Sequence, residues 1–204
     1  MRKVVDFIAF QTIWVACVWG AGKGYGWLGP ATLGAWLPAY LFLSKRRKEE
    51  ALLAAVCGMI GFGVDTLHTL LGIFMPARFI LPDPFCPLWL LALWINMAPL
   101  INSSLSWLHG RYFLALLFGA LGGPLAYWSG MRLGAISFGQ QQPFGLLVLA
   151  CSWAAMFPLL LWVSNRLRSV GVVSTLKNTA CLLVSPQRGG VKNYLRNWYI
   201  IING

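Results

Sequence analysis

The sequence predicts an all-α fold, a polytopic membrane helical bundle with six transmembrane helices and both termini in the cytoplasm. Three observations lead to this prediction: an apolar composition, six apolar stretches of near-spanning length, and an uneven distribution of lysine and arginine. Of the 204 residues, 58% are apolar and only 10% are charged, whereas about a quarter of an average globular domain is charged. The mean hydropathy is +0.68. A soluble fold of this length would need more polar residues to cover its surface.

A helix that crosses the hydrocarbon layer of a bilayer, roughly 30 Å thick, needs about 20 mostly apolar residues. We expect six such helices, over Val4–Gly20, Trp27–Leu43, Ala51–Phe74, Pro87–Leu108, Tyr112–Gly130 and Phe144–Val163. Together they form one transmembrane domain over residues 1–168. Residues 169–204 form a basic cytoplasmic tail, for which partial disorder and an atypical structure both stay open.

The positive charges predict the orientation. With the N-terminus inside, thirteen of the 16 lysines and arginines fall on the cytoplasmic side, and only Lys23, Arg78 and Arg132 fall on the other side. Membrane insertion leaves the excess of positive charge in the cytoplasm, so both termini are expected there. An odd number of helices would disturb this partition. The net charge of +11 therefore predicts contact with membrane lipids, and we expect no nucleic-acid partner.

Familiar catalytic motifs are missing from the sequence. It has no nucleotide-binding loop, no HExxH and no GxSxG. The five cysteines show no paired spacing, so neither a disulfide framework nor a zinc site is indicated. The sequence thus predicts no metal and no cofactor, and it leaves open whether the protein is an enzyme. Polar residues inside the apolar helices are the remaining candidates for a site.

Asp65 and His68 are the most informative of these residues, because a spacing of three places them on one helix face. The same face carries the small residues Ala51, Ala54, Gly58, Gly61 and Gly72. We expect Leu53, Ile60, Leu67 and Leu71, on the opposite face, to contact lipid. An aspartate this deep in a membrane must be paired, protonated or beside water. We predict Asp65 and His68 as catalytic candidates, for proton transfer or for holding a polar substrate. A buried structural pair that pins helix packing is the equal alternative.

The predicted fourth helix offers a second polar face. Asn96, Asn102 and Ser103 recur on it at helical spacing, and we predict them as ligand-binding residues opposite the acidic pair. Hydrogen bonds between helices in the bundle core are the alternative.

The predicted fifth helix combines glycines with aromatic residues. Gly119, Gly122 and Gly123 suit close helix contact, and Tyr127 and Trp128 suit the outer membrane interface. Faces of small residues can pack within one chain or between chains. A homo-oligomer or a membrane partner therefore stays open.

Two strings of the sequence are also familiar. LWINMAPLINSSLSWL (93–108) and GALGGPLAYWSGMRLGA (119–135) resemble the bacterial membrane family catalogued as domain of unknown function 2878. The resemblance extends over Phe7–Arg168. It implies a small multi-pass protein of the inner membrane of Gram-negative bacteria, and it leaves the activity open.

Three functions are therefore considered. The first is binding or modification of a lipid or small amphiphile at a polar site near the membrane midplane. The second is a non-catalytic membrane scaffold or accessory subunit. The third is a small transporter, against which stand the lack of an internal repeat and the single ionisable pair inside the membrane.

Overall fold

The computed structural model describes residues 2–77, 81, 85–138 and 142–184. The chain divides into two compact units, residues 1–168 and 169–204, and the first holds all the features discussed below. Residues 185–204 of the predicted tail lie outside the described residues. The tail's cytoplasmic location stays a prediction.

The described residues are helical, as predicted, and they form six α-helices. These are α1 (Arg2–Gly22), α2 (Leu28–Leu43), α3 (Arg47–Leu70), α4 (Leu88–Asn102), α5 (Tyr112–Arg132) and α6 (Gln142–Val184). A short 3-10 helix, η1 (Ser106–Leu108), follows α4. The two-residue strands β1 (Met75–Pro76) and β2 (Ile136–Ser137) pair antiparallel after α3 and α5. This small pairing has no counterpart in the sequence-based prediction.

Two helices end earlier than the sequence predicts, because local hydrogen bonds stop them. The third helix was expected to reach Phe74, but Gly72 adopts a φ of +68°, and the amide of Ile73 donates to the carbonyl of His68 at 2.9 Å. This is a glycine-based helix end. In α4 the backbone of Ser103 leaves the helical conformation, with φ −111° and ψ −84°. The amide of Leu105 then donates to the carbonyl of Leu100 at 3.0 Å.

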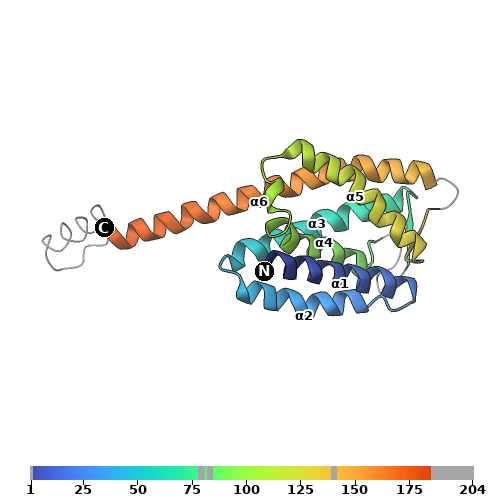
Figure 1. The fold of residues 1–204 in the computed structure, drawn as a ribbon, viewed down its shortest axis with the longest axis horizontal. Coiled ribbons are helices and arrows are strands. Elements are labelled where there is room, and N and C mark those ends of the chain that lie inside the picture. The colour runs from blue at the N-terminus through green and yellow to red at the C-terminus, as the bar shows by residue number, and fades with distance from the viewer. Residues whose placement is uncertain (1, 78–80, 82–84, 139–141, 185–204) are drawn as a thin grey trace, which may run out of the picture. The chain divides into compact units, whose positions relative to one another are not determined.

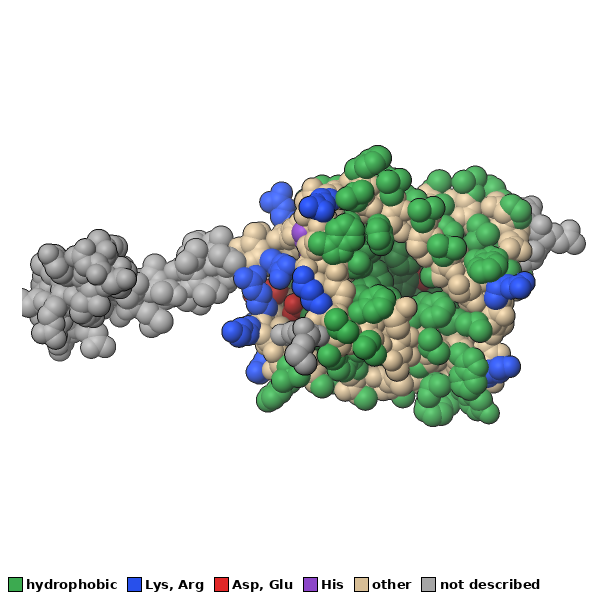
Figure 2. Space-filling model, in the orientation of Figure 1, with side chains coloured by type: hydrophobic (Ala, Val, Ile, Leu, Met, Phe, Trp, Pro, Cys, Tyr) green, Lys and Arg blue, Asp and Glu red, His purple; other side chains and the backbone are tan. Residues whose placement is uncertain are grey.

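Length and surface both fit a membrane protein. Four helices in the described residues are long and apolar enough to span a membrane: Lys3–Gly22, Arg47–Leu70, Tyr112–Arg132 and Gln142–Ser169. The apolar helices α2 and α4 have 16 and 15 residues, so α4 is only about 22 Å long. Large apolar side chains are exposed, among them Phe42 at 70% and Phe113 at 73%. Figure 2 shows hydrophobic side chains over the middle of one face and Lys and Arg toward its two ends.

The helix α4 is the centre of the packing. It contacts α1, α2 and α3, and in Figure 1 it is seen between the α1–α2 pair and the α5–α6 pair. Its indole side chains Trp89 and Trp94 are 1% and 2% exposed. Residues of α4 belong to both hydrophobic cores of the first unit.

The face of α3 predicted to contact lipid is only partly exposed. Leu67 and Leu71 are 53% and 63% exposed, but Leu53 is fully buried. The prediction for Leu53 was wrong because this residue lies on the same i, i+4 row as Gly61 and Asp65, which faces the bundle.

Glycines allow the closest helix contacts. A Cβ on Gly61 would collide with the ring of Trp94, and one on Gly58 would lie 2.9 Å from a side-chain carbon of Ile95. The small-residue face of α3 is therefore used within this chain, against α4.

We expect Gly61→Ala to lower the melting temperature of the purified protein in detergent. The added methyl would push on Trp94, and overpacking of this kind costs about 1–3 kcal/mol. Gly63→Ala is the matched control, because a Cβ there meets nothing within 4 Å. The control should keep or raise the melting temperature, since alanine favours a helix over glycine by up to about 1 kcal/mol. Equal behaviour of the two variants would contradict the Gly61–Trp94 contact.

Candidate functional site

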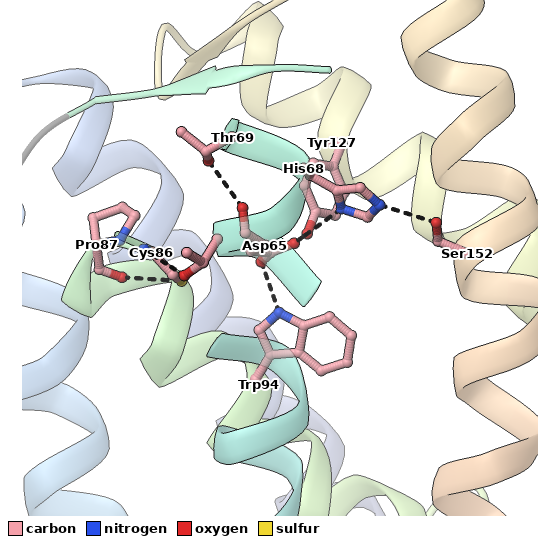
Figure 3. Close-up of polar contacts among 9 residues, drawn as sticks. Asp65, His68, Thr69, Cys86, Pro87, Trp94, Tyr127 and Ser152 are labelled. Carbon is pink, nitrogen blue, oxygen red and sulfur yellow. Dashed lines mark hydrogen bonds and ion pairs between the residues drawn. The ribbon is translucent and has the colours of Figure 1, made fainter. Parts of the chain in front are cut away.

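Asp65 lies at a junction of helices (Figure 3). Its side chain on α3 is fully buried. The indole Nε1 of Trp94, on α4, donates to Oδ2 at 2.7 Å, and the hydroxyl of Tyr127, on α5, donates to Oδ1 at 2.6 Å. Hydrogen bonds to charged groups contribute about 1.5–3 kcal/mol each. The two donors satisfy a carboxylate that would otherwise be costly to bury.

His68 extends this cluster to a fourth helix. The ring is 4% exposed, and its Nδ1 lies 3.6 Å from Oδ1 of Asp65. Its Nε2 lies 2.9 Å from Oγ of Ser152, on α6. The predicted pair Asp65–His68 is thus brought together, and three partners join it: Trp94, Tyr127 and Ser152.

Aromatic packing holds the two donors of Asp65 in place. Trp94 stacks on Trp153 with ring centroids 4.5 Å apart and planes 10° apart. The ring of Tyr127 meets Phe74 edge to face at 5.1 Å. Because both rings are fixed by neighbours, the carboxylate meets its donors without reorganisation of side chains.

A cavity of about 380 Å³ lies on the other side of these aromatic residues. It is lined from four helices, by Gln11 and Trp14 of α1, Trp94 of α4, Tyr127 of α5 and Trp153 of α6, among others. In Figure 2 it is the hollow in the middle of the face, walled by hydrophobic side chains. Trp94 and Tyr127 thus contribute both to the cavity wall and to the Asp65 cluster.

A sequence model of the family described as Protein of unknown function (DUF2878) matches residues 3–159. The chain belongs to this family. The resemblance drawn from residues 93–108 and 119–135 is thereby confirmed. No curated protein and no solved structure matches the chain. Asp65, His68 and Ser152 all lie inside the DUF2878 match.

The three predicted ligand-binding residues of this DUF2878 member make no hydrogen bond to Asp65 or His68. Each of the three also has different hydrogen-bond partners. Asn96 is 1% exposed and donates through Nδ2 to the carbonyl of Phe10 at 3.1 Å, joining α4 to α1. Ser103 bonds within its own helix end. Asn102 donates to Oε2 of Glu50 at 2.8 Å. Glu50 lies about 22 Å from Asp65 along α3.

Asn102 belongs to a second polar cluster that sequence reasoning missed. The hydroxyl of Ser164 donates to its Oδ1 at 2.5 Å, and Nε2 of His109 lies 3.3 Å from that hydroxyl. Glu50 is 8% exposed and Ser164 is fully buried. In the sequence, Glu50 ends the charged run Lys45–Glu50 between the predicted second and third helices. No spacing in the sequence links it to Asn102.

Tyr127 was expected at the outer membrane interface, and its burial inside the bundle was not predicted. The side chain is 7% exposed and bonds to Asp65. A signal was available, because Tyr127 continues the i, i+4 row of Gly119 and Gly123, which faces Trp153. The glycine row marked the bundle side of α5.

We expect Tyr127→Phe to destabilise the protein by about 1–3 kcal/mol, because it leaves one buried oxygen of Asp65 without its donor. Tyr25→Phe removes the same hydroxyl from a side chain that is 54% exposed. This control should change stability by less than about 0.5 kcal/mol. Thermal unfolding in detergent measures both, and a Tyr127→Phe protein as stable as the control would refute the predicted role of this bond.

Proposed function

We propose that this DUF2878 protein is an inner-membrane protein that crosses the bilayer six times and binds a hydrocarbon chain of a membrane lipid in its cavity. The cavity between α1, α4, α5 and α6 is the observation that carries the proposal. Binding of a lipid chain in this cavity depends on the proposed topology.

Contacts at one end of the bundle support the proposed topology. Arg46, just before α3, donates through Nη1 to the carbonyl of Arg168 at 3.4 Å. The hydroxyl of Ser104, just after α4, donates to the carbonyl of Lys3 at 2.7 Å. Basic residues from three distant parts of the chain thus lie at the end that the charge distribution assigns to the cytoplasm. The helices α2 and α4 have 16 and 15 residues, so they would cross with local thinning of the bilayer or with flanking residues completing the span.

The cavity wall is largely apolar apart from the amide of Gln11, and three polar groups of its aromatic side chains are engaged elsewhere. The indole N–H groups of Trp89 and Trp94 donate to Ala77 and Asp65, respectively. The hydroxyl of Tyr127 also donates to Asp65. These aromatic side chains therefore present mainly ring carbon to the cavity. A polar ligand would find few partners there, whereas a hydrocarbon chain needs none.

The size and setting of the cavity favour a lipid chain. Ligand cavities commonly measure about 300–1,000 Å³, and this one measures about 380 Å³. It lies among helices whose outer faces expose large apolar side chains such as Leu121 and Leu125. In a bilayer, acyl chains are the abundant molecules of matching chemistry. Asp65 would then act as a positioning residue, holding Trp94 and Tyr127 in the wall.

The topology predicts the side of two fusion points. A reporter fused after Arg168 should be cytoplasmic, and one inserted beside Lys23 should be periplasmic. Paired fluorescent and alkaline phosphatase reporters in cells measure the two locations. A periplasmic signal after Arg168 would overturn the six-crossing topology.

Filling the cavity should displace the lipid chain. Gly122 lines the cavity, and a Cβ there meets nothing within 4 Å, so we expect Gly122→Leu to fold and to occupy the space. The matched control is Gly63→Leu, at an equally open helical position on α3 outside the cavity.

The measurement is photo-crosslinking in vesicles of a phospholipid with a diazirine in its acyl chain, followed by peptide mapping. Adducts on Trp14 and Met97, which line the cavity, should fall several-fold in Gly122→Leu and persist in Gly63→Leu. Adducts on exposed Phe113 should persist in both. Unchanged adducts on Trp14 and Met97 in Gly122→Leu would contradict the proposal.

A further inference from the structure

Asp65, His68 and Ser152 form a chain of three functional groups from α3 and α6 (Figure 3). Oγ of Ser152 lies 2.9 Å from Nε2 of His68, and the other ring nitrogen faces Oδ1 of Asp65 at 3.6 Å. A hydroxyl, an imidazole and a carboxylate in this order constitute a nucleophile, a base and a group that orients the base.

The surroundings of His68 favour the tautomer that such a chain requires. Nδ1 is buried and has no hydrogen-bond acceptor closer than the carboxylate of Asp65. If Nδ1 carries the proton, its N–H bond directs partial positive charge toward the carboxylate of Asp65. Without the proton, the lone pair of Nδ1 would face the lone pairs of Oδ1. With the proton on Nδ1, Nε2 is an acceptor. The hydroxyl of Ser152 must then donate to His68.

Ser152 also differs from most other hydroxyl residues of these helices. Hydroxyls in helices commonly donate to a carbonyl one turn earlier. This bond is made by Thr12, Thr32, Thr69, Ser103 and Ser129. The hydroxyl of Ser152 is directed across to the imidazole on α3 instead. A serine that only filled space in α6 would have the local carbonyl available.

We propose that Ser152 is an activated nucleophile that accepts the acyl group of a lipid ester, with His68 as its base and Asp65 as the positioning residue for that base. Trp94 fixes the other oxygen of Asp65, Oδ2, and Tyr127 donates to Oδ1, the oxygen that faces His68. The separation of 3.6 Å between Nδ1 and Oδ1 suits a resting site, because hydrogen bonds between catalytic groups often tighten only when substrate binds.

The proposed reaction is hydrolysis in two transfers. Oγ of Ser152 bonds to the ester carbonyl carbon while its proton passes to Nε2 of His68. The bond to the alcohol oxygen then breaks, and this oxygen takes the proton from Nε2, which leaves an acyl-serine. Water attacks the acyl carbon and gives a proton to Nε2, and Oγ leaves and recovers that proton. The products are a carboxylic acid and an alcohol.

The position of His68 favours an ester near the membrane boundary. His68 lies two residues before the end of α3 at Leu70, about 3 Å along the helix axis. With the proposed topology, this end lies at the outer surface, where the ester groups of lipids meet the hydrocarbon layer. Ser152 is half-buried on α6, so one side of it is open to such a group.

A small fluorophosphonate probe tests the nucleophile on the full chain in detergent. Such probes phosphonylate serines that an adjacent base activates. We expect labelling of the wild type to map to Ser152 and to disappear in Ser152→Ala, while Ser129→Ala keeps it. His68→Gln should reduce the labelling rate at least tenfold. A wild type that is not labelled, or labelling that survives in Ser152→Ala, would overturn the inference.

The role of Asp65 as a positioning residue must be tested with a measurement other than protein stability. Asp65→Asn keeps the shape of the side chain, and it should slow labelling and move the pH midpoint of the labelling rate. A variant that melts at a lower temperature but labels with the wild-type pH profile would remove Asp65 from the proposed site. Cavity adducts of the diazirine lipid in a protein with unreactive Ser152 would leave the lipid-binding proposal standing and overturn this one.

Discussion

The carboxylate of Asp65 constrains more of this structure than any other single group. A buried charge is strongly unfavourable unless donors surround it, and here the donors come from two other helices, at 2.7 Å and 2.6 Å. The positions of α3, α4 and α5 relative to each other are therefore tied at one point. Sliding of any of these helices by one residue, about 1.5 Å, would break a bond to a fully buried side chain.

The sequence was sufficient for the number and order of the helices, and insufficient for their exact ends and their contacts. Apolar length and charged boundaries predicted all six, and the spacing of three correctly placed Asp65 beside His68. The donors Trp94 and Tyr127 lie 29 and 62 residues away along the chain, and only the packing angles of the helices bring them in. For Asn96 the spacing predicted a polar face, but it could not tell which neighbour that face would meet, and the neighbour is α1.

Glycine placement explains how a large aromatic wall fits into a small bundle. On α5, a Cβ at Gly119 would collide with the backbone of Trp153 and one at Gly123 with its indole, so these glycines allow α6 and the indole to lie against the backbone of α5. Trp153 then stacks on Trp94, which in turn bonds to Asp65. Gly122 is turned away from this packing. The same helix thus closes the core with two glycines and leaves space at the cavity with a third.

The Asp65 cluster also connects the two proposed activities. On one side its donors Trp94 and Tyr127 form part of an apolar cavity, and on the other side the carboxylate faces His68 and, through it, Ser152. A substitution of Asp65 alters both sides at once, so its phenotype alone cannot assign a role. Gly122 lines the cavity and Ser152 does not, and neither bonds directly to the carboxylate. Changes at these two positions therefore separate lipid binding from acyl transfer, which changes at the central residue cannot do.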